Sequence, residues 1–153
     1  MDFLIALVIL LGLSFIGTVT TFTVIGQKHR RRVIDHLSEI GVLTETKLKS
    51  HDYEMTVKGS HYKIKLVYTP GAHEVSFNSK RHWQVFTPSN KKMLETNGFY
   101  ELEGKKVIVI YPNPGKIVKY INENEIVFVK PNMDVFGMHV INCDQIDSYF
   151  SQT

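Results

Sequence analysis

Two alternating runs, EMTV and HYKIKLVY, flank a Gly-Ser pair between Glu54 and Tyr68. This alternation predicts a β-hairpin with a two-residue loop at Gly59 and Ser60. In that register Glu54 lies opposite Lys65, and Lys63 shares their face of the hairpin. A carboxylate beside two amines could form a catalytic site, intact or degenerate, or it could form the cross-strand ion pair of an ordinary solvated sheet face. The hairpin alone leaves both interpretations open.

The strands around the hairpin decide which side chains share its polar face. A turn at TPGA (residues 69–72) followed by HEVSF predicts a third antiparallel strand, with Leu66 facing Val75. Ile64 and Leu66 are then expected in the core. Lys63 and Lys65 are expected to be exposed or to line a shallow groove.

The rest of the chain predicts helices on both sides of these strands. The fold class is α/β (α+β): a small mixed-sheet domain in which an antiparallel meander is flanked by helices. The further predicted elements are a helix from Lys28 to Ile40, a helix from Pro88 to Asn97, strands at 105–112, 126–129 and 139–142, and a closing helix that begins with Asp144 as N-cap and runs through Phe150.

A long apolar segment opens the chain. Residues 3–25 contain no charged side chain over 23 positions, enough for a helix to cross about 30 Å of hydrocarbon. A cleaved secretory signal is the alternative, but only Met-Asp precedes the segment and no Ala-x-Ala site follows it. We therefore expect residues 1–26 to be a transmembrane anchor and residues 27–153 to be one soluble domain.

Four cations follow the apolar segment directly: Lys28, Arg30, Arg31 and Arg32. Under the positive-inside rule they predict a single-pass protein of the cell membrane with a cytoplasmic C-terminal domain. They also suit anionic membrane lipid, and more weakly nucleic acid. The single Cys143 agrees with a reducing compartment.

The order of elements resembles the nuclease-related domain of the restriction-endonuclease-like superfamily. The resemblance covers residues 27–150 and rests on an acidic residue before the hairpin turn (Glu54, or Asp52), on the triplet Lys63-Ile64-Lys65, and on Trp83 downstream. It implies that an acidic residue and an acidic-x-Lys triplet on neighbouring strands hold a divalent metal and activate water for phosphodiester cleavage.

This chain departs from that pattern at a metal ligand, because the triplet begins with Lys63. An ammonium group there repels Mg²⁺, which prefers carboxylate oxygens. The resemblance therefore predicts remnant catalytic positions at Glu54, Lys63 and Lys65, with no cofactor. Mg²⁺ is expected only if another acid, Asp52 or Glu74, has taken over the missing position.

Three functions follow from these observations. The first is a membrane-anchored, inactive nuclease-related domain that binds nucleic acid, with Lys80 and Arg81 on the phosphates and Trp83 stacking a base; the competing interpretation puts Trp83 in the core. The second is a membrane-anchored scaffold for a protein partner that the sequence does not identify. The third is an active metal-dependent nuclease with a relocated acid. No zinc site is expected, because the histidines lack the spacing of zinc ligands.

Overall fold

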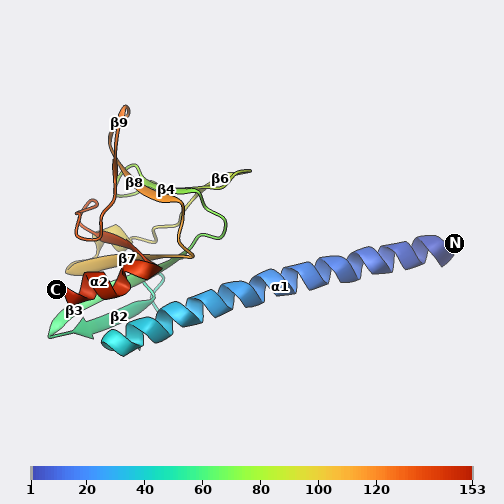
Figure 1. The fold of residues 1–153 in the computed structure, drawn as a ribbon, viewed down its shortest axis with the longest axis horizontal. Coiled ribbons are helices and arrows are strands. Elements are labelled where there is room, and N and C mark those ends of the chain that lie inside the picture. Colours follow the sequence, from blue (N-terminus) through green and yellow to red (C-terminus); the bar gives the residue numbers. More distant parts are fainter. Residues whose placement is uncertain (1, 153) are drawn as a thin grey trace.

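A computed structural model describes residues 2–152, and its most prominent element is one long helix, α1 (Asp2–Ile40), that leaves a compact β-rich domain (Figure 1). The predicted helix over 28–40 is confirmed as the last third of α1. It continues from the apolar segment without a break. The apolar side chains over 4–16 are exposed, whereas Val33 and Leu37 are buried in the domain. The expected boundary at 26/27 thus lies inside a continuous helix.

Within residues 2–152, ten strands form two five-stranded mixed sheets, which confirms the mixed α/β class. Sheet A has the order β1-β2-β3-β7-β10, and sheet B has the order β6-β5-β4-β8-β9. The strands of sheet A are β1 (Val42–Glu45), β2 (Tyr53–Val57), β3 (Ser60–Tyr68), β7 (Lys105–Tyr111) and β10 (His139–Asn142). The strands of sheet B are β4 (Glu74–Phe77), β5 (Trp83–Phe86), β6 (Lys91–Met93), β8 (Lys116–Asn122) and β9 (Glu125–Phe128).

The hairpin of β2 and β3 turns at Lys58 and Gly59, one residue earlier than predicted. Both residues have positive φ, 48° and 82°, as a two-residue turn with a matching twist requires. Glu54 therefore faces Lys63, and the predicted pairing of Glu54 with Lys65 is wrong. The pairing moves by two residues, so the predicted inward and outward faces are kept.

The predicted three-stranded meander is also wrong. β3 pairs on its second side with β7, in parallel, and β4 belongs to sheet B, between β5 and β8. The physical reason is the composition of β7, whose residues Val107 to Ile110 are completely buried. A strand that is apolar on both faces gains most from a central position between two layers.

Sheet A accordingly separates two cores. On one face α1 and the closing helix α2 (Ile146–Ser151) pack with Ile64, Val107 and Val109. On the other face side chains of sheet B and the 3-10 helix η1 (Phe99–Glu101) pack with Ile108 and Ile110. The buried strand over 105–112 and the strand over 139–142 are confirmed as β7 and β10, and the strand over 126–129 is β9, one residue earlier.

Two helix predictions need correction. Residues 88–97 contain β6 instead of a helix, because Lys91 to Met93 pair with the edge of β5. The closing helix is present, but Asp144 is not its cap. Asn142 and Gln145 form a capping box around the 3-10 turn η2 (Cys143–Gln145), which leads into α2.

Candidate functional site

The predicted catalytic positions lie on one face of β2 and β3, but their side chains do not converge. Glu54 is exposed and Lys63 lies beside it in the register, with its Nζ donating to the carbonyl oxygen of Glu103 at 2.9 Å. Lys65 is buried, at 7% exposure, and its Nζ donates to the carbonyl oxygen of Ser50 at 3.1 Å. The expectation that Lys65 would be solvated or line a groove is therefore wrong.

The burial of Lys65 follows from the second sheet. This face of β3 is turned toward the core between the sheets, where the Nζ of Lys65 lies 5.9 Å from the centre of the Phe99 ring. Burial lowers the pKa of Lys65, while the charges of Asp52 and Glu95 oppose that shift. An amine held in this way is a structural group with one backbone acceptor and a nearby aromatic face.

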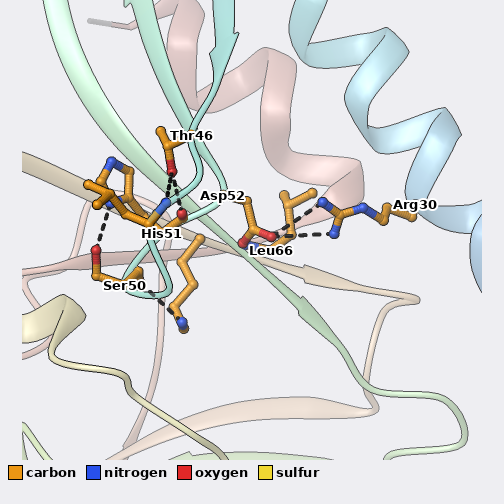
Figure 2. Close-up of polar contacts among 8 residues, drawn as sticks. Arg30, Thr46, Ser50, His51, Asp52 and Leu66 are labelled. Atoms are coloured by element: carbon orange, nitrogen blue, oxygen red, sulfur yellow. Dashed lines mark hydrogen bonds and ion pairs between the residues drawn. The ribbon is translucent and has the colours of Figure 1, made fainter.

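The acid that organises this region is Asp52, just before β2 (Figure 2). Its Oδ1 accepts from Nη1 and Nη2 of Arg30, each at 3.3 Å, and its Oδ2 accepts from the backbone N–H of Leu66 at 2.8 Å. We call this set, Arg30, Asp52 and the N–H of Leu66, the α1 clamp. It ties the helix that leaves the apolar segment to the central sheet.

The loop between β1 and β2 holds Asp52 in place. The Oγ1 of Thr46 donates to the carbonyl oxygen of His51 at 2.7 Å. The backbone N–H of Thr46 donates to the backbone carbonyl oxygen of Asp52 at 2.9 Å. His51 is buried, with Nδ1 3.0 Å from the Oγ of Ser50. Its Nε2 lies 3.5 Å from Oε1 of Glu54, outside hydrogen-bond geometry. These contacts give the clamp a fixed geometry.

The residues of this face do not fit Mg²⁺. Both carboxylate oxygens of Asp52 are already engaged, and Glu54 has an ammonium group, Lys63, as its strand neighbour. Glu74, the other candidate acid, lies in sheet B and pairs with Lys116 at 2.8 Å. Within residues 2–152, no three histidine, cysteine or acidic side chains are grouped to hold a metal.

The predicted nucleic-acid residues divide into two groups. Lys80 and Arg81 are exposed, and Arg81 contacts Glu101 at 3.7 Å and lies over the Tyr100 ring. Trp83 is completely buried, and its Nε1 donates to the carbonyl oxygen of Lys80. It therefore fills the core, as the competing interpretation had it, and cannot stack a base.

The fold adds a cation that sequence reasoning missed. Lys106 on β7 lies next to Lys63 on β3, and burial together with the charges of Lys80 and Lys63 lowers its pKa. Three lysines far apart in the sequence thus form one basic cluster, defined as Lys63, Lys80 and Lys106. The juxtaposition of Lys63 and Lys106 depends on the parallel pairing of β3 with β7, and that of Lys80 on the position of the β4–β5 loop, neither of which a local pattern predicts.

A cavity of about 360 Å³ lies where β7 and β10 end, against α1. His29, Arg32, Asn113, Cys143 and Asp144 line it. Burial raises the pKa of the Cys143 thiol, and the neighbouring Asp144 adds to the shift. The thiol is therefore held in its protonated, weakly nucleophilic form.

The cations after the apolar segment also separate by role. Lys28, Arg31 and Arg32 are exposed, whereas Arg30 is half-buried in the α1 clamp. Three of the four predicted membrane-proximal cations are thus exposed, with Arg32 at the cavity beside β7 and β10, and the fourth connects the helix to the sheet.

Comparison with known proteins adds no relative: no protein-family model, no curated protein and no solved structure matches this chain.

Proposed function

We propose that this chain is a single-pass membrane protein whose non-catalytic cytoplasmic domain, fixed to its anchor, serves as a binding module at the membrane surface. The observation that carries the proposal is the continuity of α1 from Asp2 to Ile40. The helix is long and apolar enough to cross a membrane, with a mean hydropathy of 2.3 in its most apolar stretch.

The two parts of α1 require two different surroundings. Leu10 and Phe15 are 66% and 70% exposed, which is costly in water and favourable in lipid. Leu37, in the same helix, is completely buried under sheet A. A bilayer around the first part and the domain around the last part satisfy both. The exposed Lys28, Arg31 and Arg32 support the cytoplasmic orientation.

Membrane insertion and orientation are tested separately. Alkaline carbonate extraction of the full chain should leave it in the membrane fraction. Labelling of an exposed engineered cysteine, Lys130→Cys in a Cys143→Ser background, with a membrane-impermeant maleimide should require permeabilised cells. Labelling of intact cells would reverse the orientation, and release by carbonate would contradict the anchor.

A restriction-endonuclease-like origin remains part of the proposal. The β2–β3 hairpin, the buried strand β7 and the closing helix α2 support it, whereas β6 occupies the place expected for a helix over 88–97. The absence of a fitting metal-ligand pair on β2 and β3 favours a scaffold over a nuclease.

Nucleic-acid binding is the second candidate function, and the basic cluster of Lys63, Lys80 and Lys106 favours it. Phosphate contacts of this kind make affinity fall steeply with salt. The full chain in detergent should bind single-stranded DNA or RNA with a salt slope that Lys80→Ala lowers by about one, whereas Lys130→Ala, an exposed lysine outside the cluster, leaves it unchanged. Equal slopes for both variants would remove this candidate.

A further inference from the structure

One surface of the domain lies beside α1 at Gly26, where the proposed membrane span ends. Tyr68, at the end of β3, packs its ring against α1 at Gly26, where an added Cβ would lie 3.2 Å from the phenol oxygen. Gly26 directly follows Ile25, the last residue of the apolar segment. Tyr68 is 38% exposed, and tyrosine is a side chain that membrane interfaces favour.

A groove opens beside Tyr68, with a volume of about 270 Å³. One wall is formed by Tyr68 and Pro70, and the other by Val85, Lys92 and Leu94. Of the described residues that line it, Lys92 is the only charged one, and Thr69, Thr87 and Asn90 add polar groups to an otherwise apolar surface. A phospholipid has this combination of chemistry, an apolar body next to an anionic phosphate.

The strand at the rim of the groove is exposed and basic. β6 forms one edge of sheet B, and its three residues, Lys91, Lys92 and Met93, are all exposed. In Figure 1, β6 reaches farther toward the N-terminal end of α1 than the rest of the domain. Lysines there can hold headgroup phosphates while Met93 contacts the apolar layer.

We propose that the groove between Tyr68 and β6, with Lys91 and Lys92 at its rim, binds anionic phospholipid of the membrane in which α1 is anchored. This inference rests on the proposed function, because it needs α1 to cross that membrane. The exposed cations of α1, Lys28, Arg31 and Arg32, follow the apolar segment directly and add to the attraction for an anionic surface.

The test places a single fluorophore on β6. The full chain carries Cys143→Ser and Met93→Cys, labelled with an environment-sensitive dye. It is reconstituted into vesicles of phosphatidylcholine alone or of a three-to-one mixture with phosphatidylglycerol. A second protein carries the dye at Phe128→Cys, on β9, which lies away from α1 in Figure 1. Flotation of both proteins with the vesicles first establishes insertion, independently of the groove.

The expected result is a blue-shifted emission at residue 93 in the anionic vesicles, quenched by a lipid with a spin label at its headgroup. Lys92→Glu should abolish both effects, and high salt should weaken them, whereas Lys130→Glu, with the same charge change, should leave them intact. The dye at residue 128 should show neither effect.

Three results would overturn the inference. One is an equal emission in the two kinds of vesicle, and another is an equal response to Lys92→Glu and Lys130→Glu. The third is shielding of residue 93 in neutral vesicles that grows with protein density, which would show that a second copy covers β6. If the protein fails to float with the vesicles, the proposed anchor itself is wrong.

Discussion

The α1 clamp gives the sharpest prediction, because its two halves can be removed separately. Asp52→Asn keeps an oxygen that can accept from the N–H of Leu66 but removes the charge that Arg30 contacts. Asp52→Ala removes both contacts. Arg30 and Asp52 are 37% and 26% exposed, so their ion pair should contribute about 0.2–1 kcal/mol. The hydrogen bond from Leu66 N–H to the carboxylate should contribute about 1.5–3 kcal/mol.

We therefore expect Asp52→Asn to lower the free energy of unfolding by about 1 kcal/mol and Asp52→Ala to lower it by about 2–3 kcal/mol. The single tryptophan, Trp83, is completely buried and reports unfolding of the domain by a red shift of its fluorescence. The measurement is a urea titration of the full chain in a mild detergent. Arg30→Gln completes a double-mutant cycle with Asp52→Asn, with an expected coupling below about 1 kcal/mol.

The control for this prediction is Asp35→Asn, an exposed acid on the same helix. It should change the unfolding free energy by less than about 0.5 kcal/mol. Equal losses for Asp52→Asn and Asp52→Ala would mean that the hydrogen bond to Leu66 contributes nothing. A loss below that of the control would refute the clamp altogether.

Three further predictions follow from burial and charge. Ile64→Ala should cost about 2–5 kcal/mol because Ile64 is completely buried, whereas Lys63→Ala should stay within about 0.5 kcal/mol in the same titration; the reverse order would contradict the register of β3. Burial raises the pKa of Tyr149 from 10.0 to about 12, so between these pH values the folded protein keeps a proton that the unfolded chain releases. The free energy of unfolding should therefore fall between pH 10 and 12, and Tyr149→Phe should reduce that slope by at most about 1.4 kcal/mol per pH unit. An unchanged slope in the variant would refute the assignment to Tyr149. The purified chain should not cleave DNA or RNA in Mg²⁺ or Mn²⁺; cleavage that Glu54→Ala abolishes would overturn the non-catalytic interpretation.

Local patterns predicted the features that local physics controls. The alternation around the hairpin placed Tyr62 and Ile64 in the core, and the apolar run in β7 predicted a strand buried on both faces. Both signals survive an error in the turn, because the side-chain period of a strand fixes its faces whatever the partner. The turn itself was off by one, since Lys58-Gly59 and Gly59-Ser60 are both acceptable two-residue loops in sequence.

The remaining errors concern partners that are distant in the sequence. TPGA is a turn, as predicted, but a turn signal does not say that the next strand joins another sheet. That change of sheet placed side chains over the outer face of β3, and so buried Lys65. In the sequence, Arg30 is one more cation after the apolar segment. Only the structure shows that it pairs with Asp52 beside the sheet.

The contact of Arg30 with Asp52 fixes the domain relative to the proposed membrane anchor. A domain on a flexible linker samples all orientations relative to its anchor. In this chain the exposed apolar residues of α1 and the residues that enter the core belong to one continuous helix. The α1 clamp and the contact of Tyr68 with Gly26 attach that helix to the sheet at two places. In the proposed membrane arrangement, this packing would set the orientation of the domain and would turn the face with β6 and its lysines toward the lipid. A binding module built in this way would present the opposite edge of sheet B, with β9, away from the lipid at a constant height.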